Sequence, residues 1–149
     1  DFWTGFFDVF GVKRRSVAIY QKAIQKITGN TGFIDLFWPS VLLVEHKSKG
    51  QDLDSAFLQA SEYILNLPEE DRPRYVIVSD FQRIRLYDLE GQNGKTEERT
   101  ISLTELPSNI RLFGFIAGYE VRHYKEEDLV NRKAVRTVVQ LYRALYDGN

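Results

Sequence analysis

Apolar residues recur at helical spacing in three parts of the chain. The segment Phe2–Phe10 is dense in aromatic side chains, and a glycine follows it as a typical helix end. The segment Leu53–Leu67 begins next to Asp52 and Asp54, either of which can cap the start of a helix. The third segment runs from about Glu127 to Tyr146. Its apolar stripe consists of Val130, Ala134, Val138, Leu141 and Leu145. We therefore expect three helices, and the stripe of the last one needs a partner surface.

Shorter apolar runs predict strands. The segment Val41–Lys47 (VLLVEHK) is apolar enough to lie in the middle of a sheet, covered on both faces. Phe33–Trp38 precedes it, and a Pro-Ser pair turns the chain between the two. Further along, Tyr75–Ser79 and Ile84–Asp88 flank a short turn and are typical of a hairpin.

The segment Val17–Thr28 fits two interpretations. Its apolar spacing suits a helix, whereas the Gly-Asn-Thr-Gly sequence that follows suits a hairpin. We favour a hairpin for its second half, with Phe33–Trp38 as the partner strand, and expect a polar surface loop over Glu90–Glu98. The resulting order is helix, hairpin, buried strand, helix, hairpin, helix. It predicts one α/β (α+β) domain with a mixed sheet and helices on both faces.

Composition narrows the classes of function. The chain has 149 residues, and 43% of them are apolar, which is enough for one compact core. Its 20 basic and 21 acidic residues give a formal net charge of -1, so any contact with DNA must be local. The absence of cysteine excludes a disulfide scaffold, a thiolate metal site and a cysteine nucleophile, and is typical of a cytoplasmic protein.

No apolar stretch is long enough for a membrane span, and no secretory signal is evident. The sequence starts at Asp1 and contains no Met, so we expect a segment of a longer protein.

Two charged residues and a histidine lie at the end of the most apolar predicted strand. Side chains alternate along a strand, so Glu45 and Lys47 project from one face and His46 from the other. The Pro-Ser turn would bring Asp35, on the neighbouring strand, alongside Glu45. Burying two carboxylates and an ammonium is unfavourable unless something compensates their charges, and a bound divalent cation would do so.

These residue types suit Mg²⁺, a hard ion that prefers carboxylate, carbonyl and water oxygens. Asp35, Glu45 and the backbone carbonyl of His46 could supply three ligands, and Lys47 could orient an attacking water or stabilise charge on a phosphate. The reaction class would be phosphodiester hydrolysis. A Glu-x-Lys pair is also common at an ordinary solvated strand end.

The helix after this strand carries Gln59 and Tyr63 one turn apart. Such residues often lie on the wet face of an amphipathic helix. Together with Asp35, nine residues and then Glu45-His46-Lys47, however, they resemble the motif of the PD-(D/E)xK nucleases. Ile34 stands where the Pro of the motif name is found, and that Pro supplies no ligand. The stretch QASEY is similar to the QxxxY element of RecB-like nucleases.

Longer segments resemble one group of these enzymes. They are FFDVFGVKRR, GFIDLFWPSVLLVEHKSKGQDLDSAFLQASEY, RYVIVSDFQRIRLYDL and LFGFIAGYE. They are similar to the amino-terminal nuclease region of MmeI-like (type IIL and type IIG) restriction-modification enzymes. The resemblance implies a restriction-endonuclease-like domain over residues 1–126 and a closing helix over 127–149 that connects to a methyltransferase domain.

The same resemblance implies an activity and partners. The domain would cleave double-stranded DNA with Mg²⁺, for which Mn²⁺ could substitute, and two copies could meet transiently to cut both strands. The full protein would also carry an adenine methyltransferase, which uses S-adenosylmethionine, and a target-recognition domain. Neither a glycine-rich cofactor loop nor an Asn/Asp-Pro-Pro-Tyr/Phe signature is present, so methylation cannot reside in these 149 residues.

By the same analogy Asp35 and Glu45 would bind the metal, and Lys47 would assist the water. Gln59 and Tyr63 would support the site or touch DNA. The family often uses an acidic residue of the first helix, for which Asp8 is the candidate.

Other polar residues are weaker candidates for a catalytic or binding role. The basic clusters KRR at residues 13–15 and KSK at 47–49 could reach phosphates, although such clusters are usually solvated surface. The side chains of His46 and His123 are expected to be structural, and Asp80 is expected to serve its own turn.

Two other classes of function stay open. One is a catalytically silent module that keeps the nuclease fold and docks or regulates a methyltransferase, which predicts no divalent metal at Asp35 and Glu45. The other is a nuclease for RNA or single strands.

Overall fold

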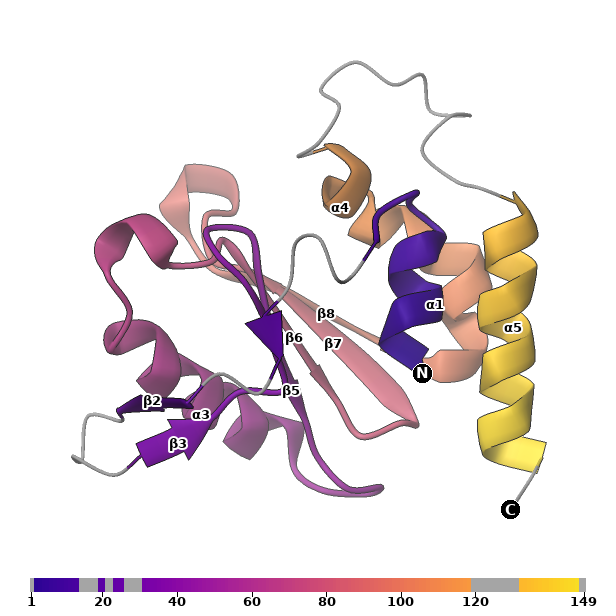
Figure 1. Cartoon of the computed structure of the whole chain (residues 1–149), viewed down its shortest axis with the longest axis horizontal. Helices are drawn as coiled ribbons and strands as arrows, with labels where there is room; N and C mark the ends of the chain where they lie inside the picture. The colour runs from indigo at the N-terminus through magenta and orange to yellow at the C-terminus, as the bar shows by residue number, and fades with distance from the viewer. Residues whose placement is uncertain (1, 14–18, 21–22, 26–30, 119–131, 148–149) are drawn as a thin grey trace. The chain divides into compact units, whose positions relative to one another are not determined.

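The computed structural model describes residues 2–13, 19–20, 23–25, 31–118 and 132–147 (Figure 1). The chain forms two compact units. The central unit is Ala18–Leu103, and the terminal unit joins Asp1–Val17 to Thr104–Asn149.

A mixed sheet forms the centre of the central unit. Its strands lie in the order β1-β4-β5-β6-β7-β8. Their bounds are Ile19–Tyr20 (β1), Leu36–Trp38 (β4), Leu42–His46 (β5), Tyr75–Ser79 (β6), Arg83–Asp88 (β7) and Glu97–Ser102 (β8). The pair β5–β6 is parallel and the other pairs are antiparallel. The apolar run that contains β5 is therefore interior to the sheet, as its composition predicts, and the mixed α/β class is confirmed.

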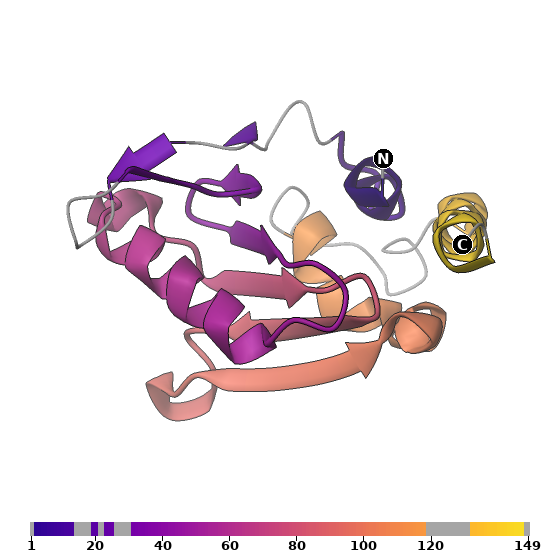
Figure 2. The same ribbon diagram turned by 90° about the horizontal axis from the view of Figure 1, so that it is seen from below.

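Helix α3 (Leu53–Leu65) connects the parallel strands β5 and β6 and lies across one face of the sheet (Figure 2). Asp52 caps its start, because the side chain accepts a hydrogen bond of 2.9 Å from the backbone N–H of Asp54. A short 3₁₀ turn, Glu69–Asp71, follows the helix. The prediction of helices over the second face of the sheet stays a prediction.

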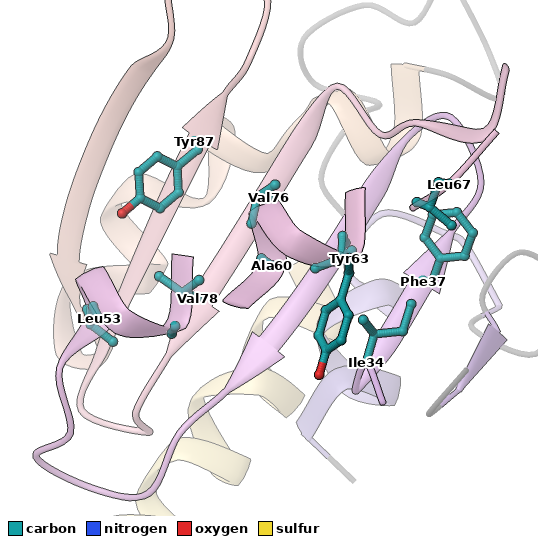
Figure 3. Packing of buried hydrophobic residues seen from close by; sticks show 11 residues of the cluster. Ile34, Phe37, Leu53, Ala60, Tyr63, Leu67, Val76, Val78 and Tyr87 are labelled. Carbon is teal, nitrogen blue, oxygen red and sulfur yellow. The ribbon is translucent and has the colours of Figure 1, made fainter. Parts of the chain in front are cut away.

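The buried face of α3 packs on apolar side chains of the strands (Figure 3). This cluster consists of Ile34, Phe37, Leu43, Leu53, Ala56, Ala60, Tyr63, Leu67, Val76, Val78 and Tyr87. Leu43 of β5 belongs to the cluster, and its neighbours Leu42 and Val44 do not, in keeping with the alternation of side chains along a strand.

The first hairpin is present, but its predicted second arm is two strands. β2 (Ala23–Gln25) pairs with β3 (Thr31–Phe33) in a separate two-stranded sheet, whereas β4 pairs with β5. The prediction of one strand over Phe33–Trp38 is therefore wrong. The strand is interrupted at Asp35. The side chain of Asp35 accepts a hydrogen bond from the backbone N–H of His46, a donor that a backbone carbonyl would accept in a continuous strand pair.

The polar loop expected over Glu90–Glu98 is shorter than predicted. It contains a 3₁₀ turn, Gln92–Gly94, and ends where β8 begins at Glu97. The first four residues of β8 are exposed, so they lack the alternation of apolar and polar side chains that identifies a strand in a sequence. Pairing with β7 defines this edge strand instead.

The terminal unit is helical. It contains α1 (Phe2–Asp8), η3 (a 3₁₀ segment, Leu103–Phe113, whose first residue belongs to the central unit), α4 (Phe115–Gly118) and α5 (Arg132–Asp147). The sequence analysis did not predict η3 and α4. It did predict α1 and α5, although residues 127–131 and the side chain of Ala134 lie outside the described part.

Helices α1 and α5 pack against each other. A Cβ atom placed on Gly5 would lie 2.5 Å from Cδ1 of Leu141, so a glycine permits the close approach. Leu141 of the predicted apolar stripe thus lies against the first helix, whereas Leu145 is exposed, and Val130 and the side chain of Ala134 lie outside the described residues. Among the described residues, no helix has both the length and the apolar character that a membrane crossing requires.

Candidate active site

The hairpin of β4 and β5 sets the two candidate carboxylates side by side. Leu36 pairs with Val44, and the same antiparallel register places Asp35 opposite Glu45. The turn between the strands closes with a 3.0 Å hydrogen bond from the Val41 N–H to the carbonyl of Trp38. The structure therefore brings Asp35 and Glu45 to the same end of this hairpin.

A direct bond also ties Asp35 to the end of β5. Its Oδ2 accepts a 2.7 Å hydrogen bond from the backbone N–H of His46. Because a carboxylate can accept several partners, this bond fixes the side chain without using its full capacity.

Glu45 lies at the buried end of β5, and only 4% of its surface is exposed. The ammonium Nζ of Lys47 is 3.8 Å from Oε1 of Glu45. An unpaired charge at this depth would be strongly unfavourable, and the nearby cation offsets part of that penalty. The Lys47 backbone N–H donates a 2.8 Å hydrogen bond to the carbonyl of Ser79, so the start of the loop between β5 and α3 is anchored to β6.

Helix α3 adds two further residues to this group. The Lys47 ammonium donates a hydrogen bond to Oε1 of Gln59, and Nε2 of Gln59 donates one of 2.8 Å to the hydroxyl of Tyr63. The Tyr63 side chain is buried in the core cluster (Figure 3). Lys47 is thus held through Gln59 by a residue of the core. The sequence singles out Gln59 and Tyr63 by their helical spacing and their resemblance to the QxxxY element, and the structure brings both to the candidate site.

His46 projects from the opposite face of β5, as the alternation predicts. Its ring stacks on Phe81 in the turn between β6 and β7, with ring centroids 4.5 Å apart and an interplanar angle of 10°. His123, the other histidine, lies outside the described residues.

The donor set at this end of β5 is small. Among the residues that the structure describes, no group of three or more His, Asp or Glu side chains could hold a metal ion. Two carboxylates, Asp35 and Glu45, and the backbone oxygen of His46 remain. Mg²⁺ in proteins commonly takes one or two carboxylates and keeps several waters, so this oxygen-only set fits the ion. Asp8 is exposed on α1 of the terminal unit, and its role stays a prediction.

Asp80 has more contacts than the turn chemistry expected of it. Its Oδ1 accepts hydrogen bonds from the backbone N–H groups of Gln82 (3.0 Å) and Arg83 (2.8 Å), which confirms the turn. Its Oδ2 accepts from Nη2 of Arg83 (3.1 Å) and from the backbone N–H of Gly50 (3.2 Å). No local sequence signal predicts the contact with Gly50, because it joins segments that are distant along the chain.

These contacts also set the protonation of Asp80, whose side chain is fully buried. Burial by itself raises the pKa of a carboxyl group. The donors from Arg83 and Gln82 outweigh it and hold the pKa of Asp80 below the ordinary value of 3.8. Asp80 is therefore a buried carboxylate, stabilised in its charged form by its neighbours.

The basic clusters are described only in part. Lys13 and Lys49 are exposed, as a phosphate contact would require, whereas Arg14 and Arg15 lie outside the described residues.

Comparison with known proteins identifies the family. The family described as "MmeI, N-terminal domain" matches residues 1–148. No curated protein and no solved structure matches the chain. The match covers nearly the whole sequence, confirms the resemblance seen in the sequence segments and indicates a part of a restriction-modification protein. The chain belongs to the family of MmeI N-terminal domains.

Proposed function

We propose that this chain is the Mg²⁺-dependent DNA endonuclease domain of a restriction-modification protein. One observation carries the proposal: Asp35 just before β4, Glu45 in β5 and Lys47 just after β5 converge at one end of β5. Ordinary packing does not require this arrangement, because apolar side chains would fill the same position at lower cost in desolvation.

Each residue has a distinct task in the proposed reaction. Asp35, Glu45 and the backbone carbonyl of His46 would hold the ion, which supplies charge neutralisation at the phosphate and a water of lowered pKa. Lys47 places its ammonium beside the carboxylates, where it orients the water or stabilises negative charge on the phosphate. Gln59 fixes that ammonium and leaves Lys47 little rotational freedom.

The substrate follows from charge and from the family. The chain is nearly neutral, so it lacks the basic field that non-specific DNA binding requires. We propose that a separate target-recognition domain supplies affinity for double-stranded DNA, and that exposed lysines such as Lys49 add local phosphate contacts. A linked adenine methyltransferase would use S-adenosylmethionine, with residues 127–149 as the connector after a nuclease domain over residues 1–126. Two copies of the protein would pair transiently in the cytoplasm and cut both strands of the DNA.

Two substitutions test the proposal in the whole protein that carries this domain. Glu45→Gln keeps the shape of the side chain and removes its charge, and Lys47→Ala removes the ammonium. Both should abolish cleavage of double-stranded DNA, while circular dichroism shows an intact fold. Glu69→Gln and Lys95→Ala, at exposed positions of the same unit, are the matched controls and should cleave normally. Normal cleavage by Glu45→Gln or Lys47→Ala would refute the proposal.

Calorimetry with Mn²⁺ separates this function from a catalytically silent docking module. The nuclease proposal predicts binding heat that disappears in Glu45→Gln. A wild-type chain that binds no Mn²⁺ would favour the silent module.

A further inference from the structure

The two oxygens of Asp80 serve different segments of the chain. Oδ1 accepts from backbone groups of the turn between β6 and β7, which are only two and three residues away. Oδ2 accepts from Gly50, thirty residues away, and from the side chain of Arg83. A turn of this kind needs one acceptor, which Asn or Ser also supplies. The second oxygen therefore serves the loop that follows Lys47.

That loop, residues 48–51, is held from several directions. Arg83 donates from Nη2 to the carbonyl of Gln51 at 3.2 Å, and Asp80 accepts from Gly50. At the start of the loop, the Lys47 N–H donates to the carbonyl of Ser79. Gly50 has a backbone φ of +80°, a conformation that favours glycine, so the sequence admits the shape that delivers its N–H to Asp80.

The same turn also contacts the end of β5 itself. The ring of Phe81 stacks on His46, the residue between Glu45 and Lys47. Phe81 has a φ of +64°, which is uncommon for a bulky residue and is tolerated when surrounding contacts impose it. The backbone N–H of Phe81 donates to Oγ of Ser79 at 3.2 Å, one of the contacts that hold it there. The turn thus contacts the chain on both sides of Lys47.

We infer that Asp80 is a positioning residue of the candidate active site, which holds the 48–51 loop through its Oδ2 and so keeps Lys47 beside Glu45 and Gln59. This inference rests on the proposed nuclease function. It extends the site beyond the segment from Asp35 to Tyr63 to the turn between β6 and β7. Asp80 acts through the backbone and is placed on neither the metal nor the DNA.

The substitution Asp80→Asn separates the two tasks. Its amide oxygen can still accept from Gln82 and Arg83, but its NH₂ group then faces two donors, Gly50 N–H and the Arg83 guanidinium. Arg83→Ala is a second variant, which removes the side-chain contact with Gln51 and keeps the backbone bonds of the turn. Asp88→Asn is the matched control. Asp88 ends the same hairpin, where it accepts from Arg74 and from the backbone N–H of Glu90.

Two measurements report on the inference. The first is hydrogen exchange of the Gly50 amide by NMR in this chain, which should be faster in Asp80→Asn and unchanged in Asp88→Asn. The second is single-turnover DNA cleavage by the whole protein, at saturating Mg²⁺ and DNA and at a temperature where circular dichroism shows every variant folded. Misplacement of a catalytic group by about 1 Å costs on the order of a hundredfold in rate, so we expect a fall of roughly ten- to a hundredfold in Asp80→Asn.

Each outcome either supports or overturns the inference. A smaller fall of the same kind in Arg83→Ala, with a normal rate in Asp88→Asn, supports the inference. Equal cleavage rates for Asp80→Asn and Asp88→Asn, or unchanged exchange of Gly50 in Asp80→Asn, overturn it and leave the proposed function intact. If the wild-type protein cleaves no DNA, the proposed function fails, and the inference that depends on it fails too.

Discussion

The ammonium of Lys47 donates a hydrogen bond to the side-chain oxygen of Gln59, which lies 12 residues further along the chain, in helix α3. This bond joins the segment directly after β5 to helix α3. Since Gln59 donates in turn to the hydroxyl of Tyr63, the geometry fixes which end of the Gln59 amide faces which neighbour. The oxygen faces the cation, and the NH₂ group faces the hydroxyl.

This polarity gives the first prediction. Gln59→Ala should lower the cleavage rate by roughly ten- to a hundredfold, because Lys47 loses its anchor. Tyr63→Phe removes only the acceptor behind Gln59, so we expect a smaller decrease. Single-turnover cleavage measures both rates. A Tyr63→Phe variant that cleaves more slowly than Gln59→Ala would contradict this arrangement, in which Tyr63 contacts Lys47 only through Gln59.

A second prediction concerns the packing of α3. Leu53 is buried in the core cluster, whereas Leu58 on the same helix is 67% exposed. Leu53→Ala should lower the free energy of unfolding by about 2–5 kcal/mol. Leu58→Ala, the same chemical change at an exposed position, should change it by less than about 0.5 kcal/mol. Urea denaturation measures both values, and equal values would show that α3 does not pack on the sheet as described.

A third prediction follows from two carboxyl groups whose pKa values lie below 3.8. Hydrogen bonding from the Arg74 side chain holds down the pKa of Asp88, and the donors of its turn do so for Asp80 against the effect of burial. A lowered pKa in the folded state means that the charged form favours folding. Its contribution is therefore complete above about pH 4 and is lost as the pH falls through the folded-state pKa.

The free energy of unfolding should consequently decrease as the pH falls below about 4. Urea denaturation between pH 6 and pH 2.5 measures this decrease for the wild type and for Asp80→Asn and Asp88→Asn. Each variant should start with a lower free energy of unfolding and lose less of it on acidification. Curves parallel to that of the wild type would assign the acid sensitivity to other groups.

A fourth prediction tests the contact between α1 and α5 in the terminal unit. Gly5→Val introduces atoms where Cδ1 of Leu141 already lies, so it should lower the free energy of unfolding by about 1–3 kcal/mol. Leu141→Ala in the same chain should recover part of that loss. A double-mutant cycle measures the coupling, which we expect to be about 1 kcal/mol. The matched cycle with Leu145→Ala, at an exposed position of α5, should give a coupling near zero.

Most of the candidate site could be predicted from the sequence because local rules place its members. Strand alternation and a short turn bring Asp35 to Glu45, and helical spacing brings Gln59 to Tyr63. The capped helix after Asp52 and the buried run around β5 follow from equally local patterns. Where hydrophobic periodicity is strong, the predicted elements are observed, and the described ends of α1, α3 and β5 differ from the predicted ones by at most two residues.

The failures have a common cause in long-range contacts. β8 carries little apolar alternation and depends on β7 for its place in the sheet. The strand predicted over Phe33–Trp38 divides because the side chain of Asp35 finds a partner in the next strand. The second role of Asp80 depends on Gly50, a residue that no spacing rule connects to it.

The crossover from β5 through α3 to β6 has a consequence for how such an enzyme would lose activity. Glu45, Lys47, Gln59 and Tyr63 all lie between the start of β5 and the end of α3, whereas Asp35 precedes β4 and Asp80 follows β6. Under the proposed function, partial opening of this element would move these four residues away from Asp35 and stop cleavage, even where the other strand pairs of the sheet stay formed.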